Sequence, residues 1–539
     1  MGCCVGANHS NWCEKYGIVY IDAEGREYCI FHAPADCKFV ELYDERDGGD
    51  KPDLMDAKQF NGLVFARIDG VIEAGVDEER DMKDDFFDHL LGGWNPRCNF
   101  TRTIFPYELD FDLYFTSEKE PIYFPPINFT KSLFLNYTSF RNINFRERTS
   151  FEAVSFYDQA IFIDAKFIED VNFDGLKIKN YADFTRTIFS KKASFLSSEF
   201  TKDTYFQNTT FKNVHFIDAK FQDPVHFNNS TFETSTSFHR TIFHDYSNFE
   251  QTKFQGGADF HLAFFKEWSY FRKTNFAKET TFAGAISKET ILLESVDLTN
   301  LKFTETNIEF FKFIDCNWGD KRFAEIYDER HKAEDCDDTT LAEIYRRLKR
   351  IARESADEEQ TSHWHYREKE MTRKNLDCEP LAPIGNILLT TIFMIPLCVL
   401  FLEIKPMSIF SFGVAISLIC TGLGIAYGDY KRIQDIDKSF TKIYLNFYKC
   451  ISGYGEDPVR AGIILLGLVL LPFIIKFLVS LWTTAPMDWL KEAMWYMPLI
   501  KITLSDSQGY HYLLKGLSVT LITLQAALFG FALRNKLRR

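Results

Sequence analysis

The chain has 539 residues, among them 55 phenylalanines and 12 cysteines, and its formal net charge is −14. This length predicts two to four domains, the cysteine content does not fit a secreted disulfide scaffold, and no segment is basic enough to suggest nucleic-acid binding. The N-terminus lacks the basic start, apolar stretch and small-residue cleavage site of a signal peptide, so we expect it to stay in the cytosol with reduced thiols.

Residues 1–40 are predicted to form a small metal-binding knuckle. Three cysteines and one histidine follow a Cys-x8-Cys-x15-Cys-x2-His spacing: Cys4, Cys13, Cys29 and His32. Three thiolates and one imidazole suit a closed, tetrahedral site for structural Zn²⁺. The Cys-x2-His arm is the informative part, because it lets two ligands reach one ion across a turn.

Two alternatives stay open for this segment. Cys3 could replace Cys4 as the first ligand, Cys37 is a spare, and the competing interpretation is a set of unrelated reduced thiols. The Met-Gly-Cys-Cys start also looks like a dual acylation signal. However, Gly6 stands where the myristoylation pattern requires serine or threonine.

Residues 41–104 are predicted to be an acidic linker that leads into the next segment and caps it. Residues 1–120 contain about 26 acidic and 12 basic residues, which accounts for a charge of about −14. The stretch 77–91 is a predicted helix. A cap is expected because the open end of an apolar repeat array would leave phenylalanine side chains in water.

From Phe124 to Phe282 phenylalanine recurs at spacings that mostly alternate between five and six residues, with one slip over residues 206–221. The first predicted core positions of this array are Phe129, Phe134, Phe140, Phe145, Phe151, Phe156, Phe162 and Phe167. The spacing fits neither a helix nor a strand, but it fits a solenoid whose short sides each point one large residue inward. The number of positions predicts roughly seven stacked coils.

The array, with its motif Phe-Ile-Asp-Ala-Lys-Phe at 162–167 and again at 216–221, resembles the pentapeptide-repeat family over about residues 105–316. The resemblance implies a right-handed quadrilateral β-helix over 105–318. The six-residue steps leave both a square and a more triangular cross-section open. The sequence Cys-Ile-Phe-His at 29–32 looks like the cysteine–histidine cluster that begins bacterial membrane-bound members of the family, which favours the zinc interpretation.

The charge of the array argues against one function known in that family. Some members imitate DNA with a strongly acidic surface and inhibit topoisomerases. Residues 124–310 contain about 23 acidic and 21 basic residues and are nearly neutral. We therefore expect a rigid spacer or a docking surface for an unknown cytoplasmic protein or ligand, and no nucleic-acid partner.

Residues 319–380 are predicted to be a helical stalk. The segment 340–352 has apolar residues at helical spacing, Thr340 and Glu343 resemble a capping box, and a second helix is expected over 358–374. Together they form a helical hairpin that resembles the junction of membrane-bound pentapeptide-repeat proteins.

Residues 381–539 are predicted to be a transmembrane region of four helices. Apolar runs near spanning length lie at 385–403, 407–427, 461–482 and 512–533. Lysine and arginine concentrate before the first run, between the second and third, and after the fourth. This distribution predicts a multi-pass protein of the bacterial inner membrane with both termini in the cytoplasm.

The sequence Ser-Gly-Tyr-Gly-Glu-Asp at 452–457 contains the Gly-Tyr-Gly of potassium-channel filters. The predicted topology puts it on the cytoplasmic side, where a filter does not belong. It also resembles a Ser-Gly-Tyr-Gly-Glu-x-Pro-x-Arg stretch of membrane-bound pentapeptide-repeat proteins. We interpret it as a turn before Pro458, which opens the following helix.

A filter would belong between the third and fourth runs. That stretch contains a candidate re-entrant segment and lacks the Thr-x-Gly-Tyr-Gly motif, which argues against a potassium-selective pore. Its pore-like residues are Trp495, Pro498, Ile502, Gly509 and Tyr510. The C-terminal region thus resembles a degraded two-span ion channel.

The sequence supports no enzyme, because no catalytic triad, phosphate loop or paired acids stand in a recognisable frame. The favoured hypothesis is a membrane-anchored scaffold or sensor whose β-helix docks a partner. The alternative is a nonselective or gated pore that the rod controls, as a stress or defence effector, which would form homo-oligomers in the lipid bilayer.

Overall fold

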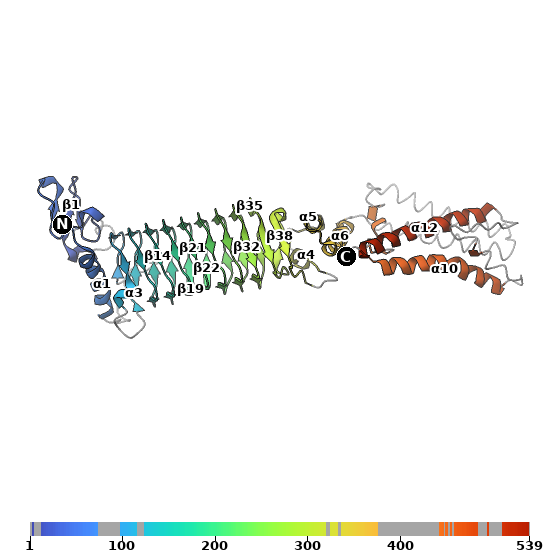
Figure 1. Ribbon diagram of the computed structural model, residues 1–539, viewed down its shortest axis with the longest axis horizontal. Helices are drawn as coiled ribbons and strands as arrows, with labels where there is room; N and C mark the ends of the chain where they lie inside the picture. The colour runs from blue at the N-terminus through green and yellow to red at the C-terminus, as the bar shows by residue number, and fades with distance from the viewer. Residues whose placement is uncertain are drawn as a thin grey trace, which may run out of the picture. The chain divides into compact units, whose positions relative to one another are not determined.

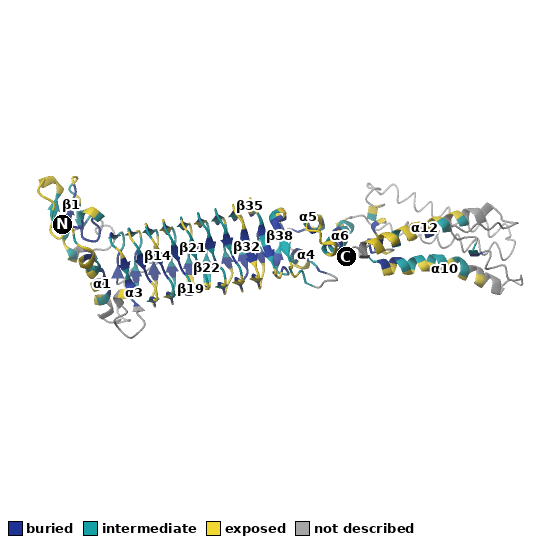
Figure 2. Cartoon of the chain, viewed as in Figure 1, coloured by how far each residue is buried: buried dark blue, intermediate teal, exposed yellow. Residues whose placement is uncertain are grey.

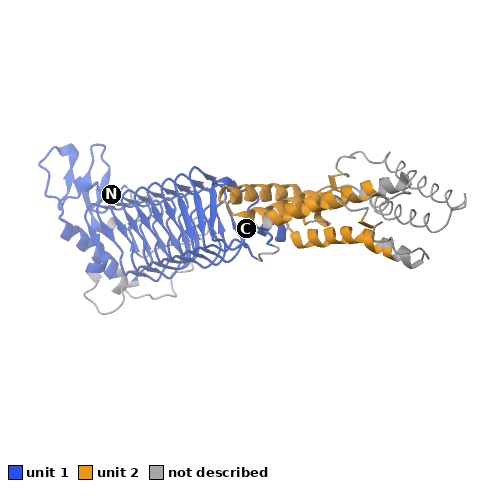
Figure 3. Ribbon diagram, turned by 45° about the vertical axis from the view of Figure 1, so that its right-hand side comes forward, with its two compact units in different colours: residues 1–331 blue, residues 332–539 orange. Residues whose placement is uncertain are grey.

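The computed structural model describes residues 3–4, 12–73, 98–115, 123–319, 324–331, 336–375, 441–442, 444–446, 448–450, 453–454, 457–482, 493–494 and 509–537. The chain divides into two compact units, Met1–His331 and Lys332–Arg539, shown in blue and orange in Figure 3. The first unit is dominated by strands and the second, in its described residues, by helices (Figure 1).

The predicted β-solenoid is present, and its strands stack in parallel to form four ladders, one on each side of the coil. Side A runs from β4 (Cys98–Asn99) to β37 (Leu301–Lys302) and side B from β5 (Ile104–Phe105) to β35 (Ile286–Ser287). Side C runs from β6 (Leu109–Asp110) to β38 (Phe311–Ile314) and side D from β7 (Tyr123–Phe124) to β33 (Asn275–Phe276). The cross-section is therefore four-sided.

The solenoid is longer than expected. Sides A and C are each ten strands deep and side B nine, against roughly seven predicted coils. The difference arises because coils also form where isoleucine, leucine or cysteine replaces phenylalanine, as at β36 (Ile291–Glu294). The slip in the spacing coincides with a register shift between β19 (Ile188–Ser194) and β22 (Thr210–His215), which both turn the corner from side D to side A.

The phenylalanines form the core, which appears as the dark blue centre of the coils in Figure 2. The eight phenylalanines predicted as the first core positions are all buried, and at most 1% of the surface of each is exposed: Phe129, Phe134, Phe140, Phe145, Phe151, Phe156, Phe162 and Phe167. Equivalent rings stack from coil to coil; the Phe145 and Phe167 centroids are 4.5 Å apart and their planes are parallel. Aromatic stacking adds to the large apolar area that each ring buries.

The alternating spacing has a backbone cause. A residue with positive φ recurs about every eleven positions, for example Asn142, Ala153 and Asp164, and each of these three lies inside a five-residue step. The residue directly after this left-handed corner is buried. Where it is threonine, its hydroxyl can donate to a carbonyl of the preceding coil, as Thr187 does to Phe162 at 2.7 Å. The buried hydroxyl is thereby satisfied, so the corner carries little desolvation penalty.

Both ends of the solenoid core are covered. At the N-terminal end α1 (Ala57–Glu73) places Phe60 against Phe105 and Phe65 against Phe111, with ring centroids 6.3 and 5.6 Å apart. At the other end the buried Asp328 of α4 (Tyr327–His331) accepts hydrogen bonds from the backbone N–H groups of Phe303 and Thr304. The predicted helix at 77–91 lies outside the described residues.

The segment before α1 forms a small sheet of β1 (Ile18–Ile21), β2 (Glu27–Cys29) and β3 (Tyr43–Asp44) in the order β2-β1-β3. Short 3-10 turns flank it: η2 (Glu14–Tyr16), η3 (Ala35–Cys37) and η4 (Glu45–Asp47). Tyr20, Ala33 and Phe39 form its own small core.

In the second unit the predicted stalk hairpin consists of α5 (Asp338–Glu354) and α6 (Glu358–Asn375). The predicted capping box is wrong: α5 begins earlier, and Asp337 is its N-cap, accepting from the Thr340 N–H at 2.7 Å. A carboxylate here satisfies a free helix N–H and also interacts favourably with the helix dipole, so it is at least as good a cap as threonine.

The predicted transmembrane region is not supported by the structure. The first two apolar runs lie outside the described residues, and the other two correspond to α10 (Pro458–Trp482) and α12 (Gly509–Leu537), which pack together. Among the helical residues that the structure describes, none forms a helix with both the length and the apolar character that crossing a bilayer requires.

The described part of the Gly-Tyr-Gly stretch, Gly453 and Tyr454, is a turn, as predicted. Gly453 and Tyr454 both have positive φ, and α10 begins at Pro458. The Tyr454 side chain is fully buried, and its ring lies 5.3 Å from that of Tyr366 on α6. The buried Tyr454 side chain therefore holds the turn against α6 of the stalk.

A buried carboxylate on α6 completes this attachment. Glu370 accepts from Arg373 at 2.6 Å, from Lys449 at 2.8 Å and from the Tyr454 hydroxyl at 3.3 Å. Burial alone would raise the pKa of Glu370, but the hydrogen bonds from Arg373 and Lys449 outweigh it and lower the pKa to about 2.

We expect Glu370→Gln to destabilise the second unit by about 2–3 kcal/mol, because the amide leaves two cations with a weaker partner. The native carboxylate should contribute its full stabilisation above its unfolded-state pKa, about 4.5, and this stabilisation should disappear as the pH falls towards about 2. The pH dependence of amide hydrogen exchange in α6 measures this loss of stability. Glu343→Gln is the control, because that side chain is 43% exposed and pairs only on the surface of α5. Equal effects of both variants would contradict the prediction.

Candidate metal centre

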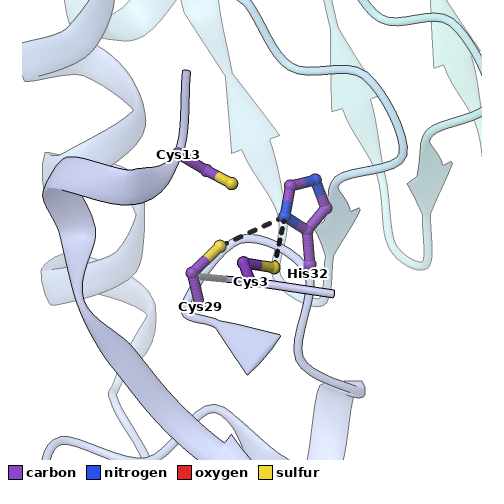
Figure 4. Close-up of side chains that lie close together, drawn as sticks. All are labelled: Cys3, Cys13, Cys29 and His32. Atoms are coloured by element: carbon purple, nitrogen blue, oxygen red, sulfur yellow. Dashed lines mark hydrogen bonds between the residues drawn. The ribbon is translucent and has the colours of Figure 1, made fainter. Parts of the chain in front are cut away.

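Three cysteines and one histidine from separate segments meet beside the first coil: Cys3, Cys13, Cys29 and His32. Cys13 precedes η2, Cys29 ends β2, and His32 lies in the turn that follows. All four are buried, and their ligand atoms lie within 4.8 Å of one another (Figure 4).

Cys3, and not Cys4, is the cysteine of this segment that lies in the cluster. The Cys4 backbone N–H donates to the Glu27 carbonyl at 2.8 Å, which fixes this segment beside β2. Neighbouring side chains of such a segment point in different directions, so only one of the two thiols can enter the cluster. Cys37, the spare, is half-buried and lies outside the cluster.

The imidazole of His32 is oriented as a metal ligand would be. Its Nδ1 lies 3.3 Å from Cys3 Sγ and 3.1 Å from Cys29 Sγ, while Nε2 lies 2.9 Å from the Thr101 carbonyl oxygen. Because a carbonyl only accepts, Nε2 donates to it, and Nδ1 is left facing the two sulfurs. Such an outer hydrogen bond typically fixes the tautomer of a metal-binding histidine.

The thiols and the imidazole perturb one another strongly. Burial lowers the pKa of His32, but hydrogen bonds to Cys29 and Cys3 outweigh it and raise the pKa to about 9. Hydrogen bonds with Cys13 and Cys29 hold the pKa of Cys3 far below that of an ordinary thiol, and those with Cys13 and Cys3 raise the pKa of Cys29.

The donor set fits tetrahedral zinc. A Zn–S bond of about 2.3 Å and a Zn–N bond of about 2.0 Å put the ligand atoms of a tetrahedron about 3.5–3.8 Å apart. The ligand atoms here already lie within 4.8 Å of one another. Four protein ligands leave no open position for water or substrate, so the arrangement suits a structural ion and not a catalytic one.

The cluster is continuous with the solenoid core. The Ile104 backbone N–H donates to the Phe31 carbonyl at 2.9 Å, and the Phe31 ring lies 5.8 Å from that of Phe100. Trp12 contacts the His32 ring at 5.3 Å and is covered by the Arg67 guanidinium at 4.5 Å. The knuckle therefore forms part of the lid over the first coil.

A buried lysine stabilises the loop that contains His32. The Lys38 ammonium donates to the carbonyls of Ile30 and Phe31, and burial lowers its pKa to about 7. Sequence reasoning missed Lys38, Thr101 and Arg67. Thr101 is 69 residues from its partner His32, and no local pattern points to it.

Of the predicted pore-like residues, the structure describes Gly509 and Tyr510. Trp495, Pro498 and Ile502 lie outside the described residues. Gly509 and Tyr510 are the first residues of α12 and therefore belong to a helix. Helical carbonyls bond along the helix axis and do not form a filter ring.

The comparisons with known proteins concern the solenoid. A family model described as pentapeptide repeats (9 copies) matches residues 129–176, 184–231, 216–263 and 238–286. No curated protein matches. A solved structure of trypsin-treated QnrB1, a plasmid-mediated fluoroquinolone resistance protein, aligns with 37% of this chain and 97% of its own, at 12% identity and a TM-score of 0.17. The family match and the four-sided ladders together identify the central part of this chain as a pentapeptide-repeat β-solenoid.

Proposed function

We propose that this protein is a non-enzymatic scaffold or sensor whose solenoid docks a cytoplasmic protein partner. The observation that supports it is the filled core. The phenylalanine rings are almost completely buried and stack coil upon coil, so the solenoid interior has no room for a ligand. The outward side chains instead form regular columns on rigid sides, which is how solenoid proteins present extended binding surfaces.

Structural zinc belongs to the same proposal. Cys3, Cys13, Cys29 and His32 would hold the ion, which neutralises the buried thiolates and fixes the knuckle over the first coil. The role of the ion is to stabilise the rod that carries the docking surface.

We further propose that the second unit attaches the scaffold to a membrane. The support is a set of exposed apolar side chains on α10, each at least 43% exposed: Val459, Ile463, Leu466, Leu470, Leu471, Ile474 and Phe477. Such a surface is costly in water. The pore hypothesis gains no support from the residues described in the second unit.

Photo-crosslinking in cells tests the docking function. A crosslinking amino acid is placed, one position at a time, on the four sides of the full-length chain, at Thr281, Lys220, Tyr270 and Lys253. We expect one defined protein to crosslink from the position on one side and not from the positions on the other three. Absence of specific crosslinks from every side would contradict the docking proposal. Recovery of the full-length chain in the supernatant after cell membranes are sedimented would contradict membrane attachment.

A further inference from the structure

Side C carries a column of aromatic rings outside the core over five successive coils, in or next to the side C strands: Tyr181, Tyr205, His226, Tyr246 and Tyr270. The ring centroids of Tyr205 and His226 are 4.7 Å apart and the rings are stacked, and those of Tyr246 and Tyr270 are 5.1 Å apart. The strands concerned are β18 (Ala182–Asp183), β21 (Thr204–Tyr205), β24 (Val225–His226), β28 (Ser247–Asn248) and β32 (Ser269–Arg272). These rings are half-buried and lie outside the phenylalanine core, so part of each ring is open to a partner.

The column ends in a surface cavity of about 290 Å³, here called the aromatic–acidic patch. Its lining residues are Asp245, Tyr246, Glu267, Trp268 and Tyr270. The Trp268 side chain is 42% exposed, and its ring lies 6.2 Å from that of Tyr270 at a shallow angle of 27°. Three aromatic rings and two carboxylates therefore surround one open space.

Two carboxylates give the patch negative charge, and Asp245 accepts a hydrogen bond from the backbone N–H of Tyr246 at 2.6 Å. Some carboxylates of the solenoid pair with a cation one coil away, as Asp164 does with Arg186 and Asp218 with Arg240. Among the described residues, no lysine, arginine or histidine forms an ion pair with Asp245 or Glu267. The patch thus combines negative charge with the electron-rich faces of aromatic rings, and both attract a cation.

We propose that the aromatic–acidic patch binds an arginine side chain of the docked protein partner. A guanidinium is flat, so it can stack on Trp268 or Tyr270 while its N–H groups bind Asp245 and Glu267. An ammonium ion can satisfy the charge but cannot stack in the same way. The proposal rests on the docking function and names the surface and the chemistry that would recognise the partner.

The test uses the full-length protein and short fluorescein-labelled peptides in which glycine alternates with arginine, lysine or glutamate. Binding is followed by fluorescence anisotropy. We expect the arginine peptide to bind several-fold more tightly than the lysine peptide, and the glutamate peptide not to bind. Glu267→Lys should weaken arginine-peptide binding more than about tenfold, and Trp268→Ala about three- to tenfold.

Two control variants make the same kinds of substitution at positions outside the patch. Glu152→Lys makes the same charge change at an exposed position outside the patch, and Ile286→Ala removes an exposed apolar side chain from side B. Neither should change binding. If Glu152→Lys weakens binding as much as Glu267→Lys does, the peptide is held only by general electrostatic attraction, and the proposal is overturned. Equal binding of the lysine and arginine peptides would also overturn it.

The proposed docking function and the assignment of the patch can each fail while the other holds. A partner that crosslinks to the solenoid and is unaffected by Glu267→Lys would leave docking in place and overturn the assignment of the patch. Arginine-specific binding at the patch, with no partner crosslinked from any side, would uphold the patch and contradict docking as the function.

Discussion

Removing zinc, or replacing Cys29 by serine, is expected to unfold the N-terminal knuckle and uncover the first coil. Structural zinc contributes about 10–16 kcal/mol of binding free energy in zinc-finger peptides, which is comparable to the whole stability of an ordinary domain. Without the ion, nothing bonds the four side chains of the cluster to one another, and Phe31 loses the anchor that holds it over the solenoid core.

Elemental analysis should find one zinc per chain in the wild type and almost none in Cys29→Ser. Hydrogen exchange should then quicken at Ile104, whose N–H donates to Phe31, and stay unchanged in the middle of the solenoid. Cys3→Ser and Cys4→Ser form the matched pair, because only Cys3 lies in the cluster. Zinc loss in Cys4→Ser but not in Cys3→Ser would contradict the assignment of the first ligand.

Gly256→Ala is expected to disrupt the stacking of two coils and to destabilise the first unit by at least about 3 kcal/mol. A Cβ atom added to Gly256 would lie 2.0 Å from the carbonyl carbon of Thr234 and 2.1 Å from the backbone nitrogen of Ser235. Both atoms belong to the backbone of the preceding coil, so no side-chain rotation can relieve the overlap. The coils must separate, and the hydrogen bonds between them must stretch.

Thermal unfolding of the first unit measures this effect. Gly70→Ala is the matched control, since its added methyl group meets nothing within 4 Å and lies on α1. In a helix, alanine is favoured over glycine by about 0.5–1 kcal/mol, so the control should be neutral or slightly stabilising. A Gly256→Ala variant as stable as the wild type would show that the coils at this corner are not in close contact.

The turn at Tyr454 and the cap of α5 show how far local patterns reach. The glycines and Pro458 were sufficient to predict a turn, because they limit the backbone to few conformations. They could not predict that Tyr454 is buried against α6 beside Glu370, because that contact joins residues 84 positions apart. The N-cap was assigned one turn too late, since Asp337 and Thr340 are both good capping residues and only the hydrogen bonds distinguish them.

By itself the sequence determined the solenoid, its phenylalanine core and three of the four candidate metal ligands. A spacing of five and six residues repeated over many coils fits a stacked solenoid but leaves its cross-section open, and Cys-x2-His brings two candidate ligands together through local geometry. Only the tertiary structure decided between Cys3 and Cys4 and paired His32 with Thr101. It also brought Asp245, Glu267 and Trp268 to one cavity. These choices depend on how distant segments and successive coils stack, and a coil places residues about 22 positions apart side by side, as the Ser247–Ser269 pairing shows.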